Sequence, residues 1–185
     1  MSDANNFGPL AALIGAWEGD QGIDVAYNHA KGESLDTPFR ERRTYAGFGP
    51  VNNGTQELYG LDYRMESIRI GEDEPFHTEV GYWMWDAATN DVMACVIVPR
   101  AMSLIAGGKA SADASELSLS AESGSGVYGI LANPYLDSKA KGTRFDLKMS
   151  IEGGTLSYEQ DLALEMSVQD AVFHHTDKNT LKKVE

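Results

Sequence analysis

Histidines and acidic residues occur together at two places in the chain, and their spacing decides which side chains can meet. His77 and Glu79 are two residues apart, and His174 and His175 are adjacent. In a β-strand alternate side chains point to the same side, so the first pair would share a face, whereas only one of the adjacent histidines could point inward. A histidine beside a carboxylate can be a metal ligand with an orienting partner, or a proton-handling pair.

Each of these patterns also has a plainer structural interpretation. The His77–Glu79 pair could be a hydrogen-bonded pair in the core. Together with Gly71 it matches only half of a cupin metal motif, because the second histidine and the later glutamate are missing. The two C-terminal histidines could form a polar pair in a solvent-facing turn. Arg100, which follows an apolar run and Pro99, could bind the carboxylate of a ligand or lie on the surface without a role.

The sequence lacks the motifs of several enzyme classes. It contains no nucleophile elbow, phosphate-binding loop or His-Glu-x-x-His motif, which argues against serine hydrolases, nucleotide enzymes and zincins. Cys95 is the only cysteine, so an internal disulfide and a cysteine metal cluster are excluded. Because it lies within an apolar run, we expect Cys95 to be a buried and unreactive thiol.

Period-two alternation predicts that β-strands position these side chains. Residues 117–121 and 145–152 alternate apolar and polar side chains, and Gly153-Gly154 after the second run indicates a β-hairpin turn. With these runs, the remaining candidates bring the total to about ten short strands. The remaining strand candidates are 14–25, 37–48, 54–70, 76–86, 91–98, 103–108, 155–160 (the second strand of the hairpin) and 168–176.

The strand pattern predicts a closed all-β fold. Closure into a barrel covers one face of the sheet and removes its exposed edges. We therefore predict one domain over residues 1–185, an antiparallel up-and-down β-barrel whose Gly15-x-Trp17 opening is similar to that of lipocalins and fatty-acid-binding proteins. Residues 7–14 are expected to form a short N-terminal helical cap, and the last dozen residues also look able to form a helix. Such a barrel can hold one apolar small molecule.

The charge of the chain limits its partners. It carries 28 acidic and 15 basic residues, a formal net charge of −13, which argues against binding to nucleic acid or to anionic membranes. The N-terminus has no signal-peptide pattern, and no apolar run approaches the roughly 20 residues of a membrane-spanning helix. We therefore expect a cytoplasmic location and no membrane partner.

Three segments of the sequence, taken in order, resemble the nitrobindin family of haem-binding β-barrels, which are also described as fatty-acid-binding-protein-like or as the haem-binding domain of THAP-type proteins. The resemblance covers most of the chain. It depends on Trp17-x-Gly19 with Gly22, on His77-x-Glu79-x-Gly81-Tyr82, and on Leu156-Ser157-Tyr158 leading to the adjacent histidines and Leu181-Lys182-Lys183-Val184.

The resemblance implies a ten-stranded barrel that binds haem b through a C-terminal histidine and has been linked to nitric oxide binding and to isomerisation of peroxynitrite. It carries the metal-ligand role to His175, because aligning this histidine needs one inserted residue before Leu181, whereas His174 needs two. A departure from the family is that Thr176, rather than leucine, follows His175. The expected cofactor-binding residues are His175, His77, Glu79, Arg100, Trp17 and Tyr82. No catalytic residue is assigned, and whether the chain is an enzyme stays open.

Two other hypotheses remain open at this point. The barrel could be a non-enzymatic carrier of a fatty acid, with Arg100 or the His77–Glu79 pair at the polar head group. It could also be filled by its own side chains and bind nothing. The sequence does not decide between a monomer and a homodimer.

Overall fold

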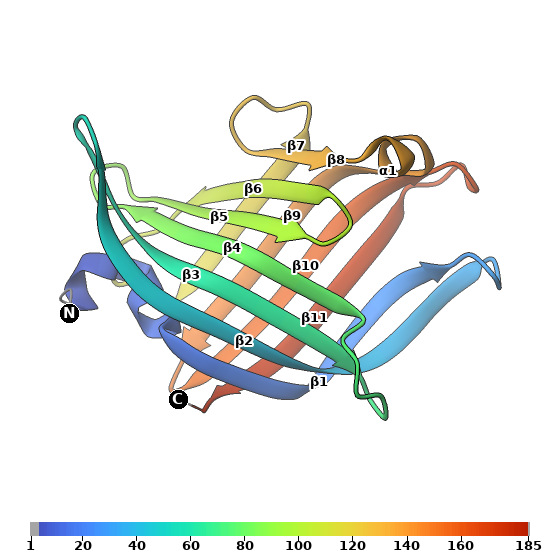
Figure 1. Ribbon diagram of the computed structural model, residues 1–185, viewed down its shortest axis with the longest axis horizontal. Helices are drawn as coiled ribbons and strands as arrows, with labels where there is room; N and C mark the ends of the chain where they lie inside the picture. The colour runs from blue at the N-terminus through green and yellow to red at the C-terminus, as the bar shows by residue number, and fades with distance from the viewer. Residues whose placement is uncertain (1–3, 185) are drawn as a thin grey trace.

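The computed structural model describes residues 4–184, which form a closed β-barrel of eleven strands (Figure 1). Around the barrel the strand order is β1-β11-β10-β9-β7-β8-β6-β5-β4-β3-β2, and β2 returns to β1. The elements are η1 (Ala4–Leu13), β1 (Gly15–Asn28), β2 (Glu33–Asn53), β3 (Gln56–Arg69), β4 (His77–Asp86), β5 (Asp91–Val98), β6 (Met102–Lys109), β7 (Glu116–Ser123), β8 (Gly129–Ala132), α1 (Pro134–Lys139), β9 (Ala140–Glu152), β10 (Thr155–Met166) and β11 (Phe173–Lys183).

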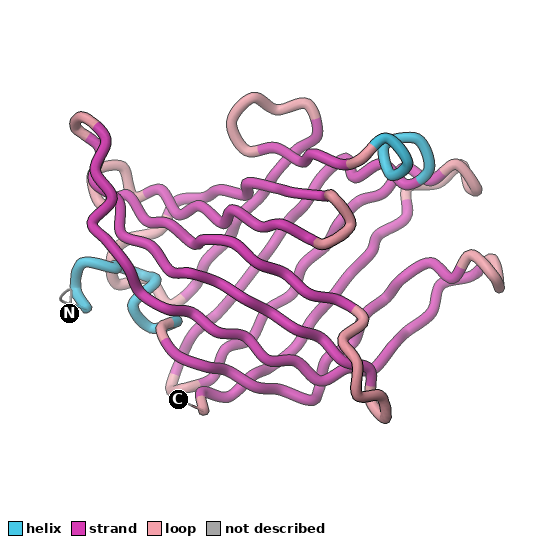
Figure 2. Tube along the Cα trace, in the orientation of Figure 1, coloured by secondary structure: helices cyan, strands magenta, loops and turns pink. Residues whose placement is uncertain are grey.

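The predicted antiparallel barrel is confirmed, with one local exception. Strand β8 pairs antiparallel with β6 but parallel with β7, and it lies between them in the sheet. This four-residue strand and the short helix α1 come from a glycine-rich segment without a clear period, so the alternation did not predict them. Figure 2 shows that strands make up most of the described chain, and short loops and two short helices make up the rest. Within residues 4–184, no helix has the length and apolar character needed to cross a membrane.

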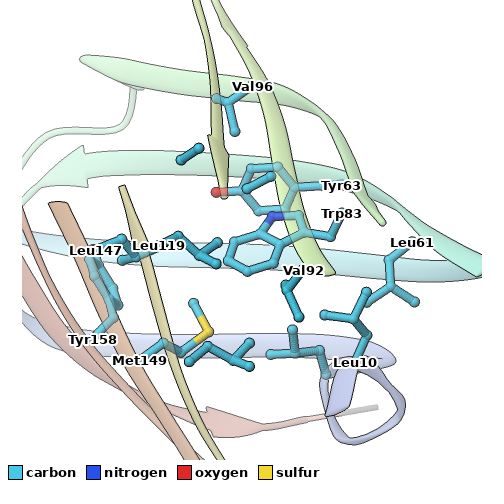
Figure 3. Packing of buried hydrophobic residues seen from close by; sticks show 14 of the residues in the cluster. Leu10, Leu61, Tyr63, Trp83, Val92, Val96, Leu119, Leu147, Met149 and Tyr158 are labelled. Atoms are coloured by element: carbon cyan, nitrogen blue, oxygen red, sulfur yellow. The ribbon is translucent and has the colours of Figure 1, made fainter. Parts of the chain in front are cut away.

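The helix η1 closes one end of the barrel, as the predicted N-terminal cap requires. Leu10 and Leu13 have no exposed surface, and the Trp17 indole donates a 2.7 Å hydrogen bond to the Leu13 carbonyl oxygen. In Figure 3, Leu10 of η1 lies beside inward-pointing side chains of strands from around the barrel, including Leu61, Val92 and Met149. Burial of this apolar cluster is the main force that holds the strands together.

The last strand completes the barrel. The interpretation that the last dozen residues look helical is wrong, because nearly all of them belong to β11, which pairs with both β1 and β10. Only Asn179 and Leu181 of β11 are fully buried, so the strand carries a weak apolar signal. Figure 1 shows the end of β11 on the same side of the barrel as η1, and the loops before β4 and β11 on the opposite side.

A bulge in β1 changes which residues point inward. The pairing of β1 with β2 shifts register between Gly19 and Gly22, so Trp17 and Asp24 are both buried although an odd number of positions separates them. In a regular strand, residues seven positions apart point to opposite faces. The extra residue therefore turns Asp24 into the barrel.

Gly81 offers a test of how closely the strands pack. A Cβ atom at this position would lie 1.9 Å from the Cys95 carbonyl oxygen of the neighbouring strand. Overpacking of this kind usually costs about 1–3 kcal/mol, so we expect Gly81→Ala to lower the free energy of unfolding by that amount in urea denaturation. Gly126, with nothing within 4 Å of an added Cβ, provides the control Gly126→Ala. Equal stabilities of the two variants would contradict the predicted contact.

Candidate functional site

Five ionisable side chains point into the barrel at the end opposite η1. We call Asp24, His77, Glu79, His175 and Asp177 the mouth cluster. His175 Nε2 lies 2.7 Å from Asp24 Oδ1 and 3.9 Å from Asp177 Oδ2, and His77 Nε2 lies 3.1 Å from Glu79 Oε1. Both imidazoles remain 35% exposed, so the mouth is accessible from solvent.

Strand alternation positions the C-terminal histidines as the sequence predicted, with one of the two inside. His175 and Asp177 share the inner face of β11, and Asp177 is directly opposite Asp24 on β1. His174 points outward, where its Nδ1 atom lies 2.7 Å from Asp161 Oδ2 in an exposed pair. Because the bulge in β1 turns Asp24 into the barrel, its carboxylate can contact His175.

Charges within the mouth cluster shift the pKa of its members. Burial alone would lower the pKa of His175, but the hydrogen bond to Asp24 and the charge of Asp177 outweigh it and raise this pKa. Burial raises the pKa of Asp177 to about 6, although the charge of His175 opposes the shift. The site therefore holds carboxylates and imidazoles whose protonation depends on one another.

The second histidine is part of a chain of hydrogen bonds. Burial would lower the pKa of His77, but its hydrogen bond to Glu79 raises it. Conversely, burial would raise the pKa of Glu79, and the hydrogen bond and charge of His77 lower it. Tyr63, on the neighbouring strand β3, donates a 2.9 Å hydrogen bond to Glu79 Oε2. His77 and Glu79 are thus a hydrogen-bonded pair, and this pair lies in the accessible mouth rather than in the closed core.

A buried ion pair lies on the inner face of β2, deeper in the barrel. Arg43 and Glu41 form a salt bridge in which their side chains are 3% and 0% exposed. Tyr158 and Asn179 donate hydrogen bonds of 2.8 and 3.1 Å to Glu41 Oε2, and the Arg43 guanidinium lies 3.8 Å from the centre of the Tyr158 ring. This network was not predicted from the sequence, although Phe39, Glu41 and Arg43 alternate along one strand and so must share a face.

The remaining predicted residues do not all reach the mouth. Arg100 and His77 line a cavity of about 190 Å³, and Arg100 has no side-chain hydrogen bond or ion pair to any residue in 4–184. Its backbone carbonyl accepts a 2.7 Å hydrogen bond from Asn133. Trp17 lies at the closed end, and Tyr82 is on the outer face with 51% of its surface exposed. The structure therefore brings together His175, His77 and Glu79, with Arg100 beside His77.

A larger hollow lies away from these residues. It has a volume of about 490 Å³ and is lined by residues of β1, β7, β9, β10 and β11, none of which belongs to the mouth cluster. We take the mouth cluster as the candidate site because it brings two imidazoles and three carboxylates together at an accessible end of the barrel.

Comparison with known proteins gives one family and one fold. The model of the family described as "THAP4-like, heme-binding beta-barrel domain" matches residues 6–183. Among solved structures, the crystal structure of Rv2717c from M. tuberculosis is similar, with a TM-score of 0.65, 20% sequence identity and 95% of each chain covered. At this identity the similarity shows the fold alone. No curated protein sequence matches the chain.

Proposed function

This chain belongs to the family of THAP4-like, heme-binding β-barrel domains, and from that membership we propose that it binds haem b in the barrel mouth with His175 as the iron ligand. The observation that supports the proposal is the 2.7 Å contact between His175 Nε2 and Asp24 on the inner face of the barrel. Histidines that bind metals usually carry such an acceptor on their other ring nitrogen, which fixes the orientation of the ring.

The residues around His175 suit a haem. Asp24 occupies one nitrogen of the imidazole, and within residues 4–184 the other nitrogen has no hydrogen-bond partner, so it is free to bind iron. On β10, Leu162 is directly opposite His175, and Phe145 of β9 is opposite Leu162. The apolar surface continues through inward residues of β8, β6 and β5, namely Ile130, Leu104 and Val96. An imidazole facing an apolar wall is the environment that a porphyrin requires.

We propose nitric oxide binding and the isomerisation of peroxynitrite as the activities of this site. When bound, ferric haem supplies a Lewis-acidic iron that binds nitric oxide or an oxygen of peroxynitrite. Asp24 orients His175, the apolar wall offers a surface for the porphyrin, and His77 holds a proton at Nε2 through its hydrogen bond to Glu79.

Titration of the purified protein with hemin tests the proposed cofactor. We expect a saturable Soret band with one hemin bound per chain. Absorbance that rises only in proportion to added hemin, without saturation, would contradict the proposal.

A fatty-acid carrier is the second candidate, and the free guanidinium of Arg100 beside the 190 Å³ cavity favours it. A cationic side chain at a cavity can bind the carboxylate of a lipid as well as a haem propionate. Native mass spectrometry after gentle purification distinguishes the candidates, because a co-purified fatty acid in place of haem would support the carrier.

Arg100 also gives a prediction about haem itself. If Arg100 binds a propionate, Arg100→Gln should weaken hemin binding by up to about fivefold, since an exposed ion pair contributes roughly 0.2–1 kcal/mol. Affinity for hemin dimethyl ester, which has no free carboxylates, should not change. The two affinities are measured by absorbance titration, and an equal loss for both ligands would mean that Arg100 acts only on local structure.

A further inference from the structure

Asp24, His175 and Asp177 bring three potential ligand atoms within 4.8 Å of one another. They come from two adjacent strands, β1 and β11, whose pairing fixes their relative positions. We infer that these three side chains form a site for a divalent first-row transition metal ion when haem is not bound. The inference goes beyond haem binding, because it uses Asp177, which has no role in the haem proposal, and makes Asp24 a metal ligand rather than the orienting partner of His175.

The placement of the two carboxylates is the first reason. Asp24 and Asp177 are directly opposite each other on antiparallel strands, where like charges destabilise the pair. Their side chains are only 9% and 21% exposed, so solvent screens the repulsion poorly. Two carboxylates held in this way favour a positive charge between them.

No permanently charged cation pairs with Asp24 or Asp177 within the described residues 4–184. The groups that face the pair are the imidazoles of His175 and His77, the carboxylate of Glu79 and the amide of Gln160, which donates a 3.1 Å hydrogen bond to Asp177. Arg43, the buried cation nearby, is paired with Glu41. A divalent ion would balance the excess of carboxylates.

The donor atoms decide which ions fit. One imidazole nitrogen with two carboxylate oxygens suits Zn²⁺, Mn²⁺ or Fe²⁺, and the absence of a thiolate from the set disfavours soft ions. Three protein ligands leave coordination positions open, and the exposure of His175 means that these would face the mouth. Because His175 is common to both sites, the ion and haem compete for the same imidazole.

Calorimetric titration of the haem-free protein with Zn²⁺ tests the inference. We expect saturable binding of one ion per chain, which Asp177→Asn weakens at least tenfold. Asp161→Asn is the matched control, because Asp161 holds the outward-facing His174 in a similar contact of 2.7 Å. This variant should bind Zn²⁺ as the unchanged chain does.

Thermal unfolding gives a second measurement that does not depend on one variant. At a fixed Zn²⁺ concentration, the ion should raise the melting temperature of the unchanged chain and of Asp161→Asn by equal amounts, and raise that of Asp177→Asn and Asp24→Asn by less. Far-UV circular dichroism checks that each variant is folded. Absence of saturable binding, or equal binding by Asp177→Asn and the unchanged chain, would overturn the inference. A negative result for Zn²⁺ would not count against haem binding, because Asp177→Asn retains His175, the proposed iron ligand.

Discussion

Replacing Arg43 by methionine is expected to lower the free energy of unfolding by about 3–5 kcal/mol. The substitution leaves the Glu41 carboxylate, which is 0% exposed, without its cation. The hydrogen bonds from Tyr158 and Asn179 remain, but neutral donors do not replace a full positive charge in a buried environment. Urea denaturation followed by far-UV circular dichroism measures the change.

A double variant separates the loss of charge balance from the loss of packing. Glu41→Gln combined with Arg43→Met removes both charges and keeps an amide oxygen that can accept from Tyr158 and Asn179. Replacing both partners of a buried ion pair is often neutral or stabilising, so this chain should recover most of the stability that Arg43→Met loses. If the double variant is as unstable as the single one, the cost arises from packing.

Removal of the proposed iron ligand should have the largest effect on cofactor binding. We expect His175→Ala to reduce hemin affinity by more than about a hundredfold, since even the loss of a residue that supports a metal ligand costs 10–100-fold. The Soret band of the titrated protein should disappear accordingly.

His174→Ala provides the control for this variant. The two histidines are adjacent, but His174 points outward, where its Nδ1 atom lies 2.7 Å from Asp161 Oδ2. Its removal should leave the Soret band unchanged. A Soret band that survives in His175→Ala would show that another group, such as His77, binds the iron.

Much of the fold was predictable because it depends on a local period. Alternation of apolar and polar side chains identified most strands, and closure of the sheet followed from the need to cover its apolar face. The pattern fails where few side chains are buried. Strand β8 has four residues and was not predicted, and β11 buries only Asn179 and Leu181, so only its first residues fell within a predicted strand, 168–176.

The candidate site was predictable only in part, for reasons that differ between residues. His77, Glu79 and His175 follow from alternation, and so does the position of Tyr82 on the outer face, opposite to His77. Asp24 could not be found by counting from Trp17, because the bulge between Gly19 and Gly22 reverses the faces.

For the other residues that were not predicted, the alternation of the strand already indicated an inward position. Asp177 is two residues after His175 and must share its face in any regular strand. Glu41 and Arg43 alternate with Phe39, which is 1% exposed, so their burial follows from the same rule. Charged residues on an apolar face are thus a sign of an internal network rather than evidence against burial.

The position of His175 on the strand that joins both ends of the sheet sets an order of events during synthesis. Until residues 173–183 have left the ribosome, β1 and β10 have unpaired edges and the imidazole is not beside Asp24. A cofactor held by His175, as we propose, would therefore be captured after translation of this segment. A nascent fragment that lacks it would expose two strand edges that can pair with other chains.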